Sequence, residues 1–573
     1  MTGENMRKKH VIYGVKKVAA VGLAMGIMTC AAACGRADDY NVDVEHAELE
    51  EMSQQADEAA EQAMASFQDA LAEDEATATD TVDVFNNGIA DGIYFIGNNL
   101  YCSENDVTLI NASYDEIVLP EALKEACPEL ESNVQRANGI FADQAQDAIN
   151  DQDALSLARD MSKDDPDNFT AFDHDQKCFI RRADEQVLSF ALFYYDIEGG
   201  AHGYSHYQGL NLDMKTGAVI ELDDVVADKD GMAEFVFNRI SEWYPDITSE
   251  EAFNLEAVKD SFTGTEELKV AFTIDPDGVT FYFAPYDLAS YAAGKQEVKV
   301  LFDEAPDLFT GKYTEQEGAW AINFRASDML GTDLDDDGVA DRINLYGDVD
   351  EYDTIVSINA SVNGNEYKED LYGFSIDPVL IHAEDGSEYI YGDVAAEGDS
   401  AMLEVYSVDK DGFKRIGGLN GGVTCADMSF GSDETSYWSS YAQLYDPACF
   451  YLKFRMELVS TYSGYKTYSI GADGIPETKD NSYISGDTYI ELTFKKDMLV
   501  DIVDEDGEII SEEEAVTAGS KGVPYRTDNE SYVDLELEDG RLARIYIDNA
   551  DEWPRTVDGE ALEDVFDGVL FAG

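Results

Sequence analysis

The sequence is poor in basic residues. Its 573 residues include 38 Lys and Arg against 120 Asp and Glu, so the formal net charge is −82 at pH 7. A chain this acidic has no basic face with which to neutralise phosphates, which excludes nucleic-acid binding of that kind. The charge also disfavours docking on anionic lipid through side chains. It fits a cationic partner or a cation-rich medium.

Cysteine and histidine are scarce, and their spacing excludes several kinds of site. No C-x-x-C pair occurs, which argues against zinc ribbons and redox motifs. Cys102 with Cys127 and Cys425 with Cys449 are candidate disulfides, and buried thiols are the alternative. The chain also has no Gly-x-Ser-x-Gly elbow, no His-Glu-x-x-His and no phosphate-binding glycine loop. We therefore predict no catalytic residues and no enzymatic activity, with an unrecognised hydrolase as the remaining alternative.

Long apolar runs are missing except near the N-terminus. Five basic residues precede the uncharged run Val18–Ala33, which as a helix would rise only ~24 Å, short of a ~30 Å bilayer core. Small residues then precede Cys34, as in a bacterial lipoprotein signal. We predict cleavage before Cys34 and lipid attachment to it, with secretory cleavage or an uncleaved anchor as alternatives. The remaining chain is expected outside the cell, on the outer face of the membrane, held there by the lipid anchor alone.

Composition divides the chain into five segments. Residues 1–33 are the predicted signal peptide, and residues 34–87 an acidic helical stalk and linker. No Lys or Arg occurs from Ala37 to Leu123, so this segment is repelled by anionic lipid. Two globular regions follow, at residues 88–310 and 311–515, and a small β-rich tail domain covers 516–573.

The first globular region combines strand and helix patterns. Strand-like runs cover residues 92–100, 106–119, 187–195 and 210–226, and helical spacing covers 120–158 and 232–243. The turn Asp275-Pro276-Asp277-Gly278 separates two further strand patterns and predicts a hairpin. These elements predict an α+β domain with an antiparallel sheet.

Two motifs in this region resemble a known family. The first runs from Tyr194 through Gly199-Gly200-Ala201-His202 to Gly217, and the second is Ala284-Pro285-Tyr286 followed by Tyr291-Ala292-Ala293-Gly294. Together they resemble the extracellular domain of the RsiV/PdaC type, shared by an anti-sigma factor and a carbohydrate deacetylase. The resemblance covers about 220 residues, near two-fifths of the chain.

The resemblance implies binding. In RsiV the corresponding region recognises lysozyme, and in PdaC it accompanies a separate deacetylase domain. Here only about 17 residues precede the apolar run, and no deacetylase metal-binding domain follows. We therefore expect the binding or sensing function alone. The leading candidate partner is lysozyme or another cationic wall-active protein, and the residues that contact it are not identified.

Two histidines close to the first motif suggest a metal site. His202 and His206 lie near Asp196 and Glu198. Residues four apart share an ion on a helix, but on a strand they are ~13 Å apart, and the flanking glycines favour a turn or strand. The pattern thus favours a structural role for His202, buried or capping a turn, over a shared metal.

The second region contains an acidic loop with calcium-binding spacing. In Asp333-Leu334-Asp335-Asp336-Asp337-Gly338-Val339-Ala340-Asp341, carboxylates occupy positions 1, 3, 5 and 9, and Gly338 permits a tight turn. The predicted ligands are Asp333, Asp335, Asp337, the Val339 carbonyl and Asp341. The loop resembles the calcium loops of integrin-type propeller repeats, and a solvated acidic turn is the alternative.

Similar Asp-Gly turns recur at residues 409–412, 504–507 and 538–540, beside alternating strand patterns. They predict a mainly β C-terminal region with partial propeller-like repeats. The sequence as a whole therefore predicts a surface-anchored extracellular binding or sensing lipoprotein. The alternative is a calcium-stabilised structural or adhesion module that binds cell-wall glycan or a neighbouring protein.

Overall fold

The computed structural model describes residues 85–571, except 87, 91, 251, 265–268, 397–400, 426–429, 433–434, 487–489 and 551–552. The predicted signal peptide, Cys34 and nearly all of the 34–87 stalk lie outside the described residues. No helix in the described part of the chain is long and apolar enough to cross a membrane.

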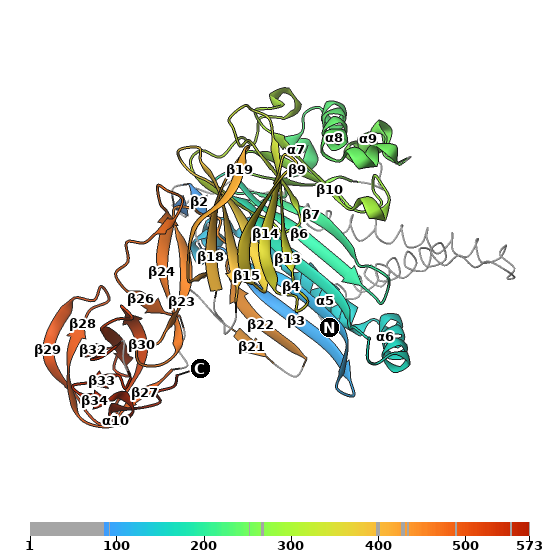
Figure 1. Ribbon diagram of the computed structural model, residues 1–573. Coiled ribbons are helices and arrows are strands. Elements are labelled where there is room, and N and C mark those ends of the chain that lie inside the picture. The colour runs from blue at the N-terminus through green and yellow to red at the C-terminus, as the bar shows by residue number, and fades with distance from the viewer. Residues whose placement is uncertain are drawn as a thin grey trace, which may run out of the picture.

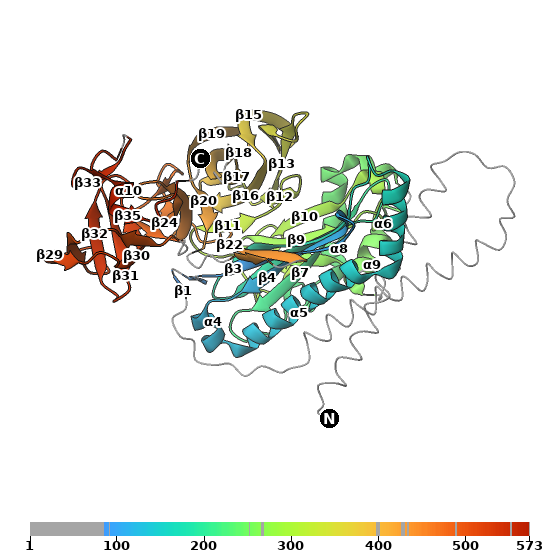
Figure 2. The same cartoon turned by 90° about the horizontal axis from the view of Figure 1, so that it is seen from below.

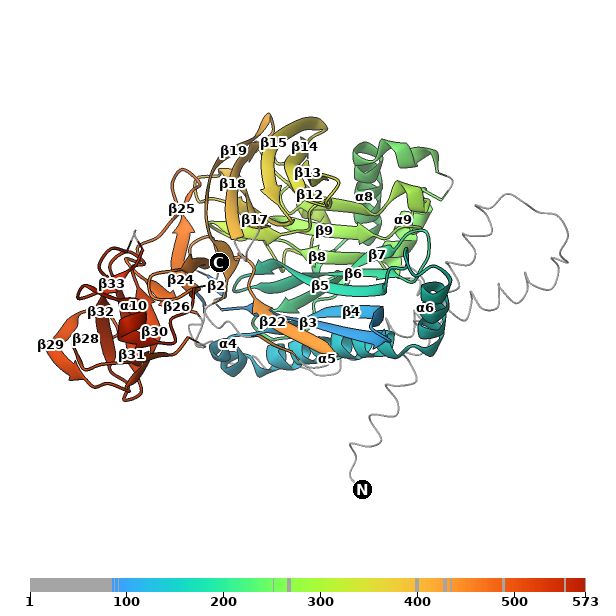
Figure 3. The same cartoon turned by 60° about the horizontal axis from the view of Figure 1, so that its bottom comes forward.

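A seven-stranded sheet forms the centre of the first region, in the order β21-β22-β3-β4-β5-β6-β7. All neighbours are antiparallel except β4 and β5, which pair in parallel. The strands from the first region are β3 (Tyr94–Glu104), β4 (Val107–Val118), β5 (Phe172–Ala183), β6 (Val187–Ile197) and β7 (Tyr204–Asp213). The other two, β21 (Phe430–Ser432) and β22 (Ser436–Tyr441), come from far along the chain, and Figure 3 shows β22 beside β3.

Three helices cover one face of this sheet: α4 (Glu121–Ala126), α5 (Pro128–Asn150) and α6 (Gln152–Asp164). Figure 2 shows α5 running along the strands. The predicted helical stretch breaks at Cys127, because Pro128 starts a new helix at its first position, where no backbone N–H is needed. Leu130, Val134 and Phe141 of α5 are buried against Phe95 and Phe190 of the sheet.

A smaller sheet of β8 (Ala271–Ile274), β9 (Gly278–Phe283) and β10 (Gln296–Leu301) packs beside β6 and β7. Helices α8 (Lys229–Trp243) and α9 (Leu255–Thr263) cover it, and the 270–283 hairpin is confirmed. The strand predicted over residues 210–226 is wrong at its C-terminal end, because residues Leu222–Val225 form the short helix α7. Three short 3₁₀ turns are η1 (Pro245–Ser249), η2 (Tyr291–Ala293) and η3 (Pro306–Leu308).

The second region contains two antiparallel sheets that pack face to face. One has the order β11-β16-β17-β18-β19 and the other β12-β13-β14-β15. Their strands are β11 (Trp320–Asn323), β12 (Met329–Thr332), β13 (Asp341–Val349), β14 (Ile355–Val362), β15 (Asn365–Gly373), β16 (Ser375–His382), β17 (Glu388–Ala395), β18 (Ala401–Asp409) and β19 (Gly412–Leu419). Ile322, Leu380 and Ile390 of the first sheet bury the shared core against Ile343 and Ile358 of the second.

The rest of the chain forms a further antiparallel assembly, which Figure 1 shows at the lower left beside the two sheets. Its strands are β20 (Gly422–Thr424), β23 (Phe450–Met456), β24 (Tyr462–Ile470), β25 (Pro476–Glu477), β26 (Tyr483–Ser485), β27 (Leu492–Phe494), β28 (Met498–Val503), β29 (Ile509–Val516), β30 (Lys521–Thr527), β31 (Tyr532–Leu537), β32 (Leu542–Tyr546) and β35 (Phe566–Asp567). The remaining short elements are β1 (Phe85–Asn86), β2 (Ile89–Ala90), β33 (Thr556–Val557), β34 (Glu560–Ala561) and α10 (Leu562–Val565).

The predicted fold class is confirmed: an α+β N-terminal region with a mainly antiparallel sheet precedes a mainly β C-terminal region. Over the described residues, none of the sheets closes into a barrel.

Candidate functional site

The two motifs that resemble the RsiV/PdaC-type domain meet in space. The ring of His202, in the turn before β7, stacks on the ring of Tyr291 in η2, with centroids 3.6 Å apart. The Tyr291 hydroxyl donates a 2.6 Å hydrogen bond to the carbonyl of Gly203. Tyr286 lies beside Tyr291, with centroids 5.8 Å apart. We call His202, Tyr286 and Tyr291 the aromatic patch.

Local backbone features hold the aromatic patch in place. Tyr286 has a φ of 79°, a left-handed conformation that costs a tyrosine of order 1–3 kcal/mol and persists only when its surroundings impose it. The next residue, Asp287, accepts a 2.6 Å hydrogen bond from the Ala284 N–H and closes this turn. The Tyr286 side chain is 43% exposed, an unusual placement for a large ring on a strained backbone. Such strain is typical of binding sites, where the fold presents a side chain for contact.

A tyrosine ring that packs against the chain explains the glycine before Tyr204. A Cβ built on Gly203 would lie 2.3 Å from the ring of Tyr195, so a side chain fits here only if that ring moves. Beneath the aromatic patch, the His206 ring stacks on Tyr194 with centroids 4.9 Å apart and also contacts Tyr204. Burial lowers the pKa of His206, which keeps its ring neutral at pH 7.

One carboxyl group, Asp287, adjoins the aromatic patch next to Tyr286. Burial raises the pKa of Asp287 to about 6. On the neighbouring strands, His174 Nδ1 lies 2.7 Å from Asp196 Oδ1, and its Nε2 lies 3.6 Å from Glu198. Burial alone would lower the pKa of His174, but these carboxylates outweigh it and raise the pKa. The arrangement combines exposed rings with negative charge, which favours contact with cationic groups.

The structure brings together only part of the predicted calcium site. Ligand oxygens of Asp333, Asp335 and Asp341 lie within 4.8 Å of one another, the only such convergence of three or more potential metal ligands among the described residues. Asp337 instead accepts a 2.9 Å hydrogen bond from the Val339 N–H, and the Val339 side chain is 47% exposed. Among the described residues, His202 and His206 belong to no such group of potential metal ligands.

The chemistry of this loop fits a hard cation. Its donors are carboxylate oxygens, the ligand type that calcium prefers. Burial, reinforced by the charges of Asp335 and Asp333, raises the pKa of Asp341 despite hydrogen bonds from Asn363 and the Leu334 N–H. Like charges this close repel one another, and a bound cation would relieve the repulsion that remains after Lys410 pairs with Asp335.

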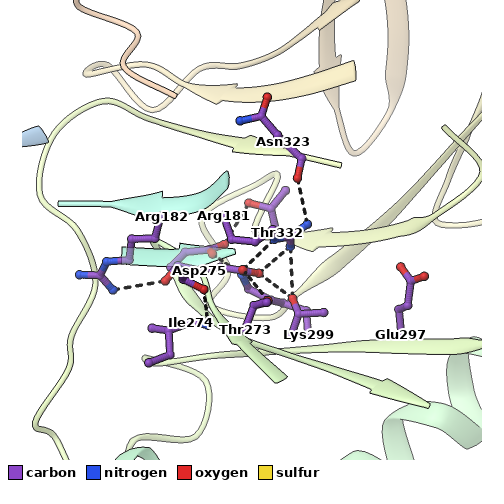
Figure 4. Close-up of polar contacts among 12 residues, drawn as sticks. Arg181, Arg182, Thr273, Ile274, Asp275, Glu297, Lys299, Asn323 and Thr332 are labelled. Carbon is purple, nitrogen blue, oxygen red and sulfur yellow. Dashed lines mark hydrogen bonds and ion pairs between the residues drawn. The ribbon is translucent and has the colours of Figure 1, made fainter. Parts of the chain in front are cut away.

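A buried ionic network, which we did not predict from the sequence, joins the two regions. Figure 4 shows Asp275 between Arg181 and Lys299. Arg181 donates to both carboxylate oxygens of Asp275, at 2.9 and 2.7 Å, and Lys299 Nζ lies 2.8 Å away. Burial alone would raise the pKa of Asp275, but the two cations lower it well below its usual value. Lys299 also pairs with Asp277, which accepts a hydrogen bond from Thr332 of β12.

A second buried group links the end of the second motif to the loop before β12. Lys295, directly after Gly294, forms ion pairs with Glu297 and Asp328, and Tyr207 donates to Asp328. Burial raises the pKa of Glu297 to about 7, although Lys295 opposes the shift. The sequence signal for both groups was a charged residue inside an apolar strand, such as Lys299 between Val298 and Val300. Such residues are almost never buried unless paired.

Comparison with known proteins gives one family match. Residues 223–303 match the model of DUF3298, a family described as a protein of unknown function. The matched segment includes Asp275, Tyr286, Tyr291 and Lys299. No curated protein matches the chain in sequence.

Solved structures of DUF3298 family members are similar to part of this chain. One from Bacteroides fragilis has 19% sequence identity and a TM-score of 0.31, covering 40% of this chain and 96% of its own length. Another from Pseudomonas aeruginosa has 14% identity and a TM-score of 0.27, covering 39% of this chain and 97% of its own.

Proposed function

We propose that this protein is an exported lipoprotein, anchored through Cys34, that binds a cationic extracellular protein such as lysozyme without carrying out chemistry on it. The observation behind the proposal is the meeting of the two motifs in the aromatic patch. Residues that the RsiV/PdaC-type resemblance singles out in separate parts of the sequence form one cluster, in which His202 and Tyr286 are exposed and Tyr291 is partly exposed. A resemblance of that kind supports recognition, since RsiV binds lysozyme through the corresponding region.

The chemistry of the aromatic patch supports a cationic partner. Tyrosine is enriched at the energetic centres of protein interfaces, because its ring buries a large area at low conformational entropy cost. Aromatic faces attract Lys and Arg, and the adjoining Asp287 adds charge complementarity. The net charge of −82 would steer a basic protein toward the chain from a distance, more strongly at low ionic strength.

The test is calorimetric titration of the full chain with lysozyme at about 20 mM and about 150 mM salt, which span a large change in screening. We expect saturable binding that weakens as salt rises. Replacing Tyr286 and Tyr291 together by Ala is expected to weaken binding about tenfold or more, the size of a hot-spot loss. The matched control is Tyr352→Ala, which removes a tyrosine that is 77% exposed in the second region.

Two results would contradict this proposal. If lysozyme does not bind at low salt, the partner is wrong. If the double variant binds as well as Tyr352→Ala, the aromatic patch is not the contact surface.

A second candidate function is a calcium-stabilised structural or adhesion module that binds cell-wall glycan or a neighbouring protein. The convergence of Asp333, Asp335 and Asp341 favours it, because calcium there would stiffen the turn before β13. A pull-down of the full chain on purified cell wall, with and without calcium, tests this candidate. Retention of the chain on cell wall that requires calcium and is unchanged when lysozyme is added would favour the adhesion module.

A further inference from the structure

A groove lies where the first region passes into the second. It has a volume of about 620 Å³, within the size range of small-ligand sites. The segment that connects β10 to β11 forms most of its wall, and His382 at the end of β16 closes one side. The groove is separate from the aromatic patch and contains none of its residues.

Aromatic rings form the floor of this groove. Phe302, Phe309 and Tyr313 line it, and each is less than a tenth exposed. The two phenylalanine rings meet edge to face with centroids 5.0 Å apart, which fixes their orientation. The Tyr313 hydroxyl donates a 2.9 Å hydrogen bond to Asp213, so its ring is also held in place.

The rim of the groove is acidic. Its acidic lining residues are Asp303, Glu315 and Glu317. The neighbouring Lys312 places its ammonium 4.8 Å from the centre of the Tyr313 ring and pairs with Asp213, so the Phe302 and Phe309 rings are the ones left for an incoming cation. His382 donates or accepts a 2.7 Å hydrogen bond with the buried Glu388, whose Oε2 has no hydrogen-bond partner within the described structure. The His382 ring stacks on Trp320, with centroids 4.7 Å apart.

Carboxylates are the main charged neighbours of His382 in the groove. Burial alone would lower the pKa of His382, but Glu388, Asp277 and Glu315 outweigh it and raise the pKa. The pKa of Glu315 is itself raised, first by burial and then by the charges of Asp303 and Asp277, while His382 and Arg182 oppose the shift. The carboxylates that raise the pKa of His382 would also attract an added positive charge.

We propose that this groove binds the guanidinium group of an arginine side chain presented by a polypeptide partner. A guanidinium is planar, stacks on aromatic faces and pairs with carboxylates through two parallel hydrogen bonds, which matches an aromatic floor below an acidic rim. The proposal does not depend on the function proposed for the aromatic patch. A partner bound here would contact the connection between the two regions directly.

The test uses the full chain, labelled with ¹³C in its histidine rings, and two short peptides. One is acetyl-Gly-Arg-Gly-amide, and the other carries citrulline in place of arginine, which keeps the shape and removes the charge. We expect the arginine peptide to bind saturably and to shift the His382 resonance, identified by its loss in His382→Gln. The citrulline peptide is expected to bind at least about tenfold more weakly, since its neutral urea forms no ion pair.

Variants locate the binding. Glu315→Gln combined with Glu317→Gln is expected to weaken the arginine peptide about tenfold or more, while Glu512→Gln, an exposed acid on β29, is expected to leave it unchanged. The Tyr286 and Tyr291 double variant should also leave it unchanged, which separates this inference from the lysozyme proposal. Equal binding of both peptides, absence of a saturable His382 shift, or full affinity in the Glu315 and Glu317 variant would overturn the proposal.

Discussion

The ammonium group of Lys410 lies 2.6 Å from Asp335 Oδ2. Lys410 belongs to the turn between β18 and β19, whereas Asp335 belongs to the acidic loop before β13. One of the three converging carboxylates is therefore neutralised by a lysine from the facing sheet. The lysine and a calcium ion would compete for this carboxylate.

The first prediction concerns calcium at this loop. At one to ten times the dissociation constant of a weak extracellular site, calcium should stabilise the fold by about 0.4–1.4 kcal/mol. A chelator should lower the melting temperature accordingly, and Asp335→Asn should abolish the calcium response. Lys410→Gln should enlarge the response, because it removes the competing cation.

Asp506→Asn is the control for this experiment, since Asp506 lies in another Asp-Gly turn and the structure gives its side chain no contact with the loop. If neither chelator nor calcium changes the melting temperature of the native chain, the loop is a solvated turn.

The second prediction concerns the buried network. Asp275→Asn should lower the free energy of unfolding by about 3–5 kcal/mol, because it leaves Arg181 buried without its carboxylate partner and Lys299 with Asp277 alone. Adding Arg181→Met should recover part of the loss by removing the uncompensated cation. Urea denaturation measures both changes. The exposed pair Asp539 and Arg541 provides the control, where Asp539→Asn should change stability by less than about 1 kcal/mol.

The third prediction concerns pH. Burial and the nearby charge of Asp377 raise the pKa of Asp393 to about 7, from an ordinary value of 3.8. The folded state then holds this proton more tightly than the unfolded state, so stability falls as pH rises from about 4 to about 7. Asp393→Asn removes the ionisation and keeps an oxygen to accept the hydrogen bond from the Val423 N–H.

The Asp393→Asn variant should therefore match the native chain at pH 4 and exceed its stability by about 1–2 kcal/mol at pH 8, after allowance for solvent screening. Melting temperatures at several pH values measure the difference. A constant difference across this range would mean that Asp393 does not titrate there.

The fourth prediction compares two glycines. A Cβ on Gly209 of β7 would lie 1.7 Å from the Phe272 carbonyl oxygen of β8. Gly209→Ala should destabilise the fold by about 3 kcal/mol or more, since backbone must move. Gly139→Ala, on the exposed face of α5 with no atom within 4 Å, should stabilise it by about 0.5–1 kcal/mol. A neutral Gly209→Ala would contradict the close approach of β7 and β8.

Much of the fold could be predicted from residues that are neighbours in the sequence. The Asp275-Pro276-Asp277-Gly278 turn predicted the β8–β9 hairpin, and the spacing of Leu130, Val134 and Ala137 predicted α5, because turn geometry and helical periodicity depend on neighbours in the sequence. The same reasoning placed a strand where α7 forms. A four-residue helix has too little periodicity to be recognised.

The candidate sites were predictable only in part. The acidic loop was visible from its spacing, but which carboxylates converge was not, since that depends on how the turn is hydrogen-bonded. Both aromatic motifs were visible as a resemblance, yet nothing local indicated that they touch.

The sequence by itself determined the acidic character, the two classes of region and the hairpins at its Asp-Gly turns, because each follows from composition or from residues adjacent in the chain. Only the tertiary structure decided that His202 stacks on Tyr291, that Asp275 sits between Arg181 and Lys299, and that β22 pairs with β3. These contacts join distant parts of the chain, so no local pattern predicts them, and a polar group that becomes buried must find its partners wherever the fold brings them.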